Sequence, residues 1–444
     1  MPTSDEPKLP FENLQGGTVY PFFMPCVRHF ILRIDNPDYA RRTVGQLLNP
    51  TSKTAPQITT TTHQAGELEY GLVMGFTYQG LTRLNLPECT FQDQYYGAFK
   101  AGAAARANRV GDVAESAPEH WTGQLGTPDV HAIVSLYVLE SDELAGRSDA
   151  VRTQLSKGRA FTELSSFDGA MLPKIGNGPG IRIHFDYTDG ISQPIIEGAS
   201  RRSSDMQPVV SSHHFFLQEE SPSYRIPEPK QLSLYGSFQV LRVLEQDVVG
   251  FENFLQSQSH IIDPELLAAK MMGRWRNGVP LILSSDTDTP SPPIPYEEYN
   301  NYNYIRTQNN PDDTLGLRCP LGAHMRRSNP RADRVQGGSV EIHRILRRGM
   351  PYGPPYDPNK PYDGIERGLL GIFICASIEN QFEFLMQDWV NRGGFIANLP
   401  ATEKDPILGD NTPEESAFTI PNQNGPLKIT GFQRFIKARG GAYF

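Results

Sequence analysis

The sequence is poor in the features that mark disulfide-rich, zinc-binding and membrane proteins. It has four cysteines in 444 residues, and no two of them form a Cys-x-x-Cys pair, which argues against a disulfide framework and against a zinc site. No apolar run approaches the roughly 18 residues of a membrane helix, and the longest, near residues 368–378, is typical of a buried strand. We therefore expect reduced, mostly buried thiols and no membrane partner.

Basic charge is also in short supply. Asp and Glu outnumber Lys and Arg by 50 to 41, which gives a formal net charge of −9 and argues against general nucleic-acid binding. The first twenty residues lack a basic segment followed by an apolar core, so no secretory signal is visible and a cytoplasmic location is expected. With 38% hydrophobic residues over 444 positions, the chain is long enough for two globular domains.

The order of the expected elements favours an α+β fold over a doubly wound sheet, because strands and helices mix without a strict alternation. A stretch rich in serine, proline and charge, residues 200–231, is expected to link two domains, which we place at 1–215 and 216–444. Strands are expected over residues 28–34, 67–77, 131–139, 180–185, 232–244, 340–346, 369–375 and 432–444, and helices after caps at Ser141, Asp247 and Asp263, the last running to Trp275, and around Phe382, Leu385 and Trp389.

The most informative stretch is Cys-Pro-Leu-Gly-Ala-His-Met-Arg-Arg-Ser-Asn-Pro-Arg, residues 319–331, in which a single histidine stands among arginines. A neutral imidazole can ligate iron and guanidinium groups pair with carboxylates, so His324 and its neighbours could bind haem through iron and propionates at once. A solvated basic loop that touches nucleic acid is the alternative. Residues 340–346 alternate, which predicts a strand with His343, Ile345 and Arg347 on one face.

This passage resembles the dye-decolorising peroxidases, and most of all their long-chain branch. The resemblance implies two ferredoxin-like domains, each an antiparallel sheet flanked by helices, with haem b mainly in the C-terminal domain. It also implies that His324 is the proximal haem ligand, that Arg331 pairs with a haem propionate and that Arg347 lies on the distal side. Other segments that carry the resemblance are Asn13–Gly16, Gly236–Phe238, Gln246–Val248, Ala268–Trp275 and Gly440-Gly441.

Asp189 is the candidate for a proton carrier on the distal side of the haem. An Asp-Gly pair after a strand is by itself typical of a turn, but the resemblance to the family's Gly-x-x-Asp-Gly motif implies that Asp189 is the distal catalytic acid. Asp186 stands where that motif has its first glycine, which puts the backbone turn in question. Because an ordinary aspartate has a pKa near 3.9, we expect an acidic optimum. Arg344 and Arg348, beside Arg347, are interpreted as solvated strand charges.

A carboxylate is expected behind His324, because an iron-bound histidine usually donates its other N–H to one. The family places this acid in an Asp-Pro-x-x-Gly segment, which the resemblance assigns to Asp405. Glu379 is the alternative. The resemblance also implies that Leu369 caps the peroxide channel, and Gly371 stands where many relatives carry phenylalanine, so a roomier distal pocket is expected there.

Two aromatic residues, Tyr352 and Trp389, align with positions that carry electrons from bulky donors at the surface in some members of the family. Packing inside the protein is the alternative for both residues.

The expected activity is that of a haem peroxidase that reduces hydrogen peroxide and oxidises dyes, phenolics or other bulky donors. A haem-binding or iron-releasing protein without peroxidase turnover is the alternative. That protein would need His324 but neither Asp189 nor Arg347. A haem-free structural or interaction module is a third reading, and fold-level likeness alone does not decide among them.

Overall fold

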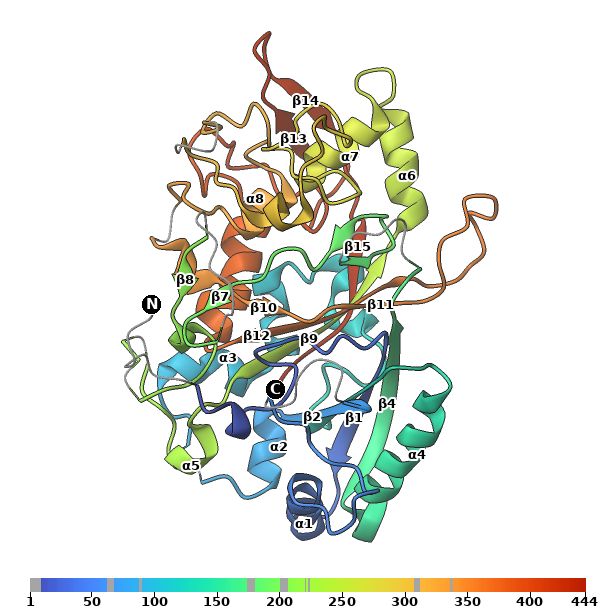
Figure 1. Ribbon diagram of the computed structural model, residues 1–444, viewed down its shortest axis with the longest axis vertical. Coiled ribbons are helices and arrows are strands. Elements are labelled where there is room, and N and C mark those ends of the chain that lie inside the picture. The colour runs from blue at the N-terminus through green and yellow to red at the C-terminus, as the bar shows by residue number, and fades with distance from the viewer. Residues whose placement is uncertain are drawn as a thin grey trace.

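The computed structural model describes residues 9–61, 68–87, 90–173, 180–199, 207–219, 221–222, 224–306, 312–335 and 338–444. In Figure 1 one antiparallel sheet lies low in the view and a second crosses the middle, with helical and irregular segments above it. The first sheet has the strand order β2-β3-β1-β4. It is formed, in chain order, by β1 (Cys26–Ile34), α1 (Pro37–Leu48), β2 (Tyr70–Phe76), β3 (Ala132–Val138), α4 (Glu143–Ser156) and β4 (Phe161–Ala170).

The second sheet repeats the topology of the first. Its strand order is β10-β12-β9-β15, with β11 also paired to β12, so the first strand of the unit again lies between the third and the fourth. Helices follow β9 and precede β15, as in a ferredoxin-like unit. The unit comprises β9 (Phe238–Gln246), α6 (Val248–Ser257), α7 (Pro264–Met272), β10 (Leu346–Arg347), β11 (Met350–Tyr352), β12 (Gly368–Cys375), two π-helical turns η10 (Ile378–Glu383) and η11 (Leu385–Val390), and β15 (Ile436–Tyr443). The expected α+β fold of two ferredoxin-like units is confirmed.

The remaining described elements are short and lie in the connections. They are the strands β5 (Ile181–Arg182), β6 (Thr188–Asp189), β7 (Ile195–Ile196), β8 (Val209–Val210), β13 (Ala417–Ile420) and β14 (Leu427–Thr430), the helices α2 (Tyr78–Arg83), α3 (Gly97–Ala101), α5 (Lys230–Ser233) and α8 (His324–Ser328), and the 3-10 turns η1 (Phe11–Asn13), η2 (Gln94–Tyr96), η3 (Ala104–Val110), η4 (Ala114–Ser116), η5 (Pro118–His120), η6 (Lys157–Arg159), η7 (Ser212–His214), η8 (Tyr296–Asn300) and η9 (Val340–His343).

Helix starts follow the expected capping chemistry in two of three cases. Asp247 accepts a hydrogen bond from the backbone N–H of Gly250, and Asp263 accepts one from Leu266. α7 ends at Met272 rather than at Trp275, because the next residue is a glycine with φ 95°. The expected cap at Ser141 is wrong, since α4 starts two residues later without a side-chain cap.

The two sheets pack face to face through one apolar core. Ile31 and Ile133 of the first sheet share a buried cluster with Leu241, Ile372 and Ile374 of the second. Side chains alternate along a strand, so the other face of β12 carries Leu369, Gly371 and Phe373. This second face is turned away from the first sheet.

Four expected segments differ from the structure. The strand expected over residues 232–244 begins only at Phe238, because α5 extends to Ser233. Residues 180–185 contain a strand only at β5. The stretch 340–346 is not a strand: η9 fills most of it, and the side chain of His343 turns inward to hydrogen-bond the carbonyl of Asn380 and stack on Phe384. The segment 200–231 is more than a linker, because Phe215 and Phe216 are completely buried. Its residues 200–206, 220 and 223 lie outside the described part.

Three of the four cysteines, Cys26, Cys319 and Cys375, are free and buried, as expected. Cys89 lies outside the described residues. Among the helices of the described part, none has the length and apolar character needed to cross a membrane.

Candidate active site

His324 is the first residue of α8, and its ring is fixed by a buried carboxylate. Its Nδ1 lies 2.7 Å from Oδ2 of Asp405, which has no exposed side-chain surface. The other oxygen of Asp405 accepts hydrogen bonds of 2.9 Å from the backbone N–H groups of Ile407 and Leu408. About a quarter of the His324 side chain (25%) remains accessible. Nδ1 is thereby engaged, and Nε2 is the ring atom available to a ligand.

The charges of this pair support each other. Burial raises the pKa of Asp405, but His324 and Arg327 outweigh it and hold that pKa below its usual value. Burial lowers the pKa of His324, and Asp405 outweighs this and raises it. The alternative acid, Glu379, is engaged elsewhere: its Oε1 lies 2.6 Å from Arg106. The geometry therefore favours Asp405 over Glu379 as the partner of His324.

Asp189 ends the short strand β6 and forms an ion pair with Arg347. Its Oδ1 accepts hydrogen bonds from the backbone N–H of Gly190 (2.7 Å) and from Nη1 of Arg347 (3.0 Å). Burial raises the pKa of Asp189, but Arg347 and the Gly190 N–H outweigh it and hold that pKa below the usual value of an aspartate. Asp186, at the motif's glycine position, adopts φ 65°, a left-handed conformation that aspartate tolerates better than most residues. The turn that precedes Asp189 is therefore kept without the glycine.

Arg347 is held from two directions. Its Nη2 donates to the carbonyl of Ser192 (3.1 Å), in the loop that follows Asp189. The side-chain amide of Gln193 bonds both backbone groups of Arg347, accepting from its N–H (3.3 Å) and donating to its carbonyl (3.2 Å). β10 is an edge strand, so the Gln193 amide occupies the place of a peptide group in a further strand. Gln193 lies three residues after the Asp189-Gly190 pair, and the sequence motifs assigned it no role.

Arg331, Arg344 and Arg347 form a group of guanidiniums that repel one another. Burial, together with Arg331 and Arg347, lowers the pKa of Arg344 to about 10, while Glu341 acts in the opposite direction. The guanidinium of Arg331 lies 3.7 Å above the Tyr302 ring. Its Nη groups donate to Asn300 and Tyr302, and its Nε is buried and has no hydrogen-bond partner within the described part. The sequence predicted that Arg344 is a solvated strand charge, and the structure contradicts this. The group of three guanidiniums suits an anionic ligand.

Arg348 is not a solvated charge either, although it was expected to be one. Its guanidinium donates to the backbone carbonyls of Gly17 (2.6 Å) and Thr18 (2.7 Å) and so fastens the N-terminal loop to β10.

The second face of β12 forms a wall beside this site. Phe373 is the cross-strand partner of Arg347, and a Cβ on Gly371 would lie 2.9 Å from the Phe373 ring. Phe373 therefore fills space that Gly371 leaves open, and the roomier pocket expected there is reduced. Leu369 lies four residues away on the same face and packs against a separate apolar cluster that contains Phe251. Its role in a channel remains a prediction.

These residues fit an iron porphyrin with anionic side chains. The Nε2 atom of His324 is free to ligate a metal, and the guanidiniums of Arg331 and Arg344 could pair with carboxylates. His324 and Asp189 are near enough for each to shift the pKa of the other, although the described contacts include no hydrogen bond between them. The acid–arginine pair and the imidazole are therefore near enough to act on one bound group.

The two aromatic candidates differ in exposure. Trp389 is completely buried (0% exposed) and packs against His343, Phe384 and Phe395, so its interpretation as a surface residue is wrong. Tyr352 is partly exposed at the end of β11, and its role in electron transfer stays a prediction.

The chain resembles known proteins both in sequence and in fold. No family model matches the chain. The sequence is 29% identical over 357 residues to a dye-decolorizing peroxidase of Exidia glandulosa, covering 78% of this chain and 68% of that protein. The structure of an ancestral D-type dye decolorizing peroxidase superposes with a TM-score of 0.83 at 27% identity, over 99% of this chain and 97% of that one. A dye-decolorizing peroxidase in complex with 2,6-dimethoxyphenol gives a TM-score of 0.82 at 25% identity, over 98% and 97%.

Proposed function

Since the chain is related to the dye-decolorizing peroxidases over most of its length and shares their fold, we propose that it is a haem peroxidase of this type. It reduces hydrogen peroxide and oxidises dyes, phenolics or other bulky donors. The observation that carries this proposal is the pairing of His324 with Asp405 on one side and of Asp189 with Arg347 on the other. A haem carrier needs the first pair but has no use for the second.

In this proposal His324 holds the haem iron through Nε2, and Asp405 keeps the ring oriented and electron-rich. Arg331 and Arg344 pair with the propionates. We favour haem b, because the sequence contains no Cys-x-x-Cys-His motif for covalent attachment. When bound, the haem supplies the two electrons that cleave the peroxide bond and regains them from the donor.

Asp189 and Arg347 act on the peroxide itself. Asp189, kept ionised by its partners, accepts a proton from one peroxide oxygen and returns it to the other, which leaves as water. Arg347 lies 3.0 Å from that carboxylate, where it can stabilise negative charge as the O–O bond breaks. Leu369 borders the approach to this pair, and Tyr352 passes electrons from donors too bulky to enter.

Two wider features belong to the same proposal. We place the domain boundary at residues 215 and 216, since β1–β4 precede it and β9–β12 and β15 follow it. We also place the protein in the cytoplasm, where the free thiols of Cys26, Cys319 and Cys375 would stay reduced.

The proposal is tested by mixing the haem-loaded protein with one equivalent of hydrogen peroxide in a stopped-flow spectrometer. We expect the ferric Soret band to convert rapidly and to return when a dye or 2,6-dimethoxyphenol is added. Asp189→Asn should slow this conversion by a factor on the order of 10² to 10⁴, while haem content is unchanged. A haem-loaded protein whose spectrum hardly responds to peroxide would be a haem carrier, and the roles given to Asp189 and Arg347 would be wrong.

A further inference from the structure

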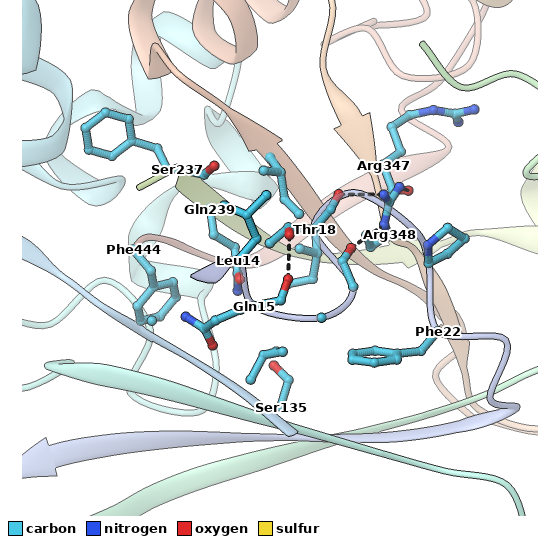
Figure 2. A pocket seen from close by; sticks show the side chains of 18 of the residues that line it. Leu14, Gln15, Thr18, Phe22, Ser135, Ser237, Gln239, Arg347, Arg348 and Phe444 are labelled. Atoms are coloured by element: carbon cyan, nitrogen blue, oxygen red, sulfur yellow. Dashed lines mark hydrogen bonds between the residues drawn. The ribbon is translucent and has the colours of Figure 1, made fainter. Parts of the chain in front are cut away.

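A chamber of about 830 Å³ lies between the two sheets, on the face of the second sheet that is turned away from Phe373 and Leu369. The N-terminal loop that carries Leu14, Gln15 and Thr18 crosses it (Figure 2). Pockets that bind small organic molecules are usually about 300 to 1,000 Å³ in volume and mostly apolar. The chamber therefore has the size of a ligand site.

The wall formed by the first sheet runs from Tyr137 of β3, past Ser135 and Val73, to Gly75 of β2. Gly75 pairs with residue 133, four positions from Tyr137, so this wall is roughly 13 Å long at about 3.3 Å for each residue of a strand. A Cβ on Gly75 would lie 3.0 Å from Cβ of Phe444. Phe444 therefore closes this end of the chamber.

The wall formed by the second sheet starts at Arg348 and also ends at Phe444. The N–H of Arg348 donates to the carbonyl of Ile372 (2.8 Å), and Ile374 follows on the same face. Gln239 is the cross-strand partner of Ile374, and its backbone bonds that of Phe444. Figure 2 accordingly shows Arg348 toward one end of the chamber and Phe444 toward the other.

Arg348 brings a positive charge to its end of the chamber. Its guanidinium donates to backbone carbonyls, and no carboxylate of the described residues is within ion-pair distance of it. Burial, together with Arg347, lowers the pKa of Arg348 to about 10, so the group stays charged at neutral pH. Asp189 also reaches the chamber, but it pairs with Arg347 at 3.0 Å. The charge of Arg348 is therefore not compensated.

This end of the chamber also offers hydrogen-bond donors. Nη1 of Arg348 donates to the carbonyl of Arg347 (2.9 Å), which leaves its second N–H without a partner among the described residues. The hydroxyl of Tyr137 lies near enough to shift the pKa of Arg348. Hydrogen bonds between a guanidinium and a carboxylate are stronger than those between neutral groups. An anionic oxygen is therefore the ligand group that suits this end.

The chamber opens to solvent past exposed apolar side chains. Phe23 is 71% exposed, Leu232 is 45% exposed, and both line the chamber. An apolar molecule in solution can therefore reach it.

We propose that the chamber is a second ligand site, separate from the haem site, that binds a monocarboxylate with an extended apolar body, such as a medium-chain fatty acid. The carboxylate pairs with Arg348 beside Tyr137, and the apolar body lies between Val73 and Ile372 and points toward Phe444. Burial of the apolar body stabilises the complex by about 25 cal/mol for each Å² removed from water. The inference goes beyond the proposed peroxidase function, in which none of these residues has a role.

The first measurement compares decanoate with decan-1-ol by titration calorimetry of the haem-loaded protein. We expect decanoate to bind at least about tenfold more tightly, because only decanoate carries a charge for Arg348. Arg348→Gln should weaken decanoate binding at least about tenfold and change that of decan-1-ol less than about twofold. Arg434→Gln is the matched control and should change neither. The Arg434 guanidinium likewise donates to carbonyls, those of Gly111 and Val113, but it lines a separate small cavity.

The second measurement narrows the chamber without touching Arg348 or the loop that it holds. Val73→Phe adds bulk between the two walls and should weaken both decanoate and decan-1-ol at least about tenfold. Val209→Phe is the control, because Val209 is 56% exposed at the surface. This pair of variants still decides the question if Arg348→Gln fails to fold.

Three results would overturn the inference. Equal losses of both ligands in Arg348→Gln would mean that its charge does not hold the carboxylate, and undiminished binding in Val73→Phe would place the ligand elsewhere. Decanoate should leave the Soret band unchanged, so a shift of the band with full affinity in Arg348→Gln would place the carboxylate at the haem. If the protein takes up no haem, the proposed peroxidase function fails, and the same titrations of the haem-free protein still decide this inference.

Discussion

At the scale of single residues, the carboxylate of Asp405 determines the state of His324. This carboxylate is completely buried, and it accepts hydrogen bonds from two backbone N–H groups and from the His324 ring. Exchanging Asp405 for asparagine keeps the shape but removes the charge behind the ring. We expect Asp405→Asn to weaken haem binding by about 10- to 100-fold, the usual effect of losing such a partner, as measured by haem titration of the haem-free protein.

The comparison variant for Asp405→Asn is Glu379→Gln, because Glu379 pairs with Arg106 instead of His324. It should leave haem affinity unchanged. Equal losses in both variants would mean that His324 does not depend on Asp405 in particular.

The Asp189–Arg347 pair determines how the peroxide step depends on pH. Asp189 accepts a proton only when ionised, and its pKa is held below the usual value of an aspartate because Arg347 and the Gly190 N–H outweigh the effect of burial. The rate should therefore rise with pH along an acid limb that lies below the usual range of an aspartate, and stay level at higher pH. Arg347→Leu leaves burial less opposed, so the pKa of Asp189 rises and this limb moves to higher pH. The plateau should also fall by about 10² to 10³.

Stopped-flow rates of the peroxide step between pH 2.5 and 7, roughly the range that brackets this pKa, test that shift. Arg182→Leu is the control, because Arg182 pairs with Asp186 rather than with Asp189. An acid limb that stays in place in Arg347→Leu would show that Arg347 does not hold the carboxylate ionised.

Short sequence motifs predicted His324, Asp189, Arg347 and Asp405 as site residues, and the structure pairs His324 with Asp405 and Asp189 with Arg347. The motifs gave no role to other residues that contact these four, such as Gln193. Arg344 could not be assigned in this way, because its environment depends on burial and on Arg331, which only the fold brings near. The burial of Trp389 likewise depends on aromatic neighbours that adjacent residues do not reveal.

At the scale of elements, the short strand β10 shows how local pattern and tertiary structure compete. Residues 340–346 alternate like a strand, yet η9 replaces most of it because His343 finds partners in the π-helical region, on Asn380 and Phe384. Within this segment only Leu346 pairs with β12, and the pairing continues at the next residue, Arg347. The long strands β1, β3 and β12 were predictable, since their apolar residues face a sheet-to-sheet core whatever the details of their neighbours.

Because β10 is so short and lies at the edge of its sheet, Gln193 should matter for the position of Arg347. Gln193→Leu keeps the size of the side chain but leaves the outward N–H and carbonyl of Arg347 without their partner. We expect the peroxide step to slow by about tenfold, as for the loss of one or two hydrogen bonds. The acid limb should also move to higher pH, because Arg347 would no longer be held against Asp189.

A merely structural role for Gln193 would lower the amount of folded protein without moving the acid limb. Gln193→Glu provides the graded comparison, since its carboxylate can accept from the N–H of Arg347 but cannot donate to the carbonyl. Its rate should lie between those of the wild type and Gln193→Leu.

At the scale of the whole molecule, the two halves share one topology, but the sequence shows no visible repeat. Both halves have the same strand order. That order requires only that apolar residues alternate along the strands, and many different sequences satisfy this requirement. The site draws on both halves: Asp189 precedes the expected boundary at residue 215, whereas His324 and Arg347 follow it. Its shape therefore depends on how firmly the halves are joined.

The join includes a fully buried ion pair between Asp112, in the segment after η3, and Arg242 of β9. Both side chains are about 5% exposed or less, and two hydrogen bonds of 2.5 Å connect them. Asp112→Ala would leave the Arg242 guanidinium buried without its carboxylate. We expect a loss of about 3 to 5 kcal/mol in the free energy of unfolding, measured by urea denaturation, because an unpaired charge in the interior is costly.

The matched control for this prediction is an ion pair of the same kind at the surface. Asp149 lies 3.5 Å from Arg152, and its side chain is 77% exposed, so Asp149→Ala should cost less than about 1 kcal/mol. Removing both buried partners in Asp112→Ala with Arg242→Met should recover much of the loss, since neither charge is then stranded. A double variant no more stable than Asp112→Ala would mean that the halves are joined mainly by the apolar core. In that case the ion pair would contribute little to the position of Asp189 relative to His324.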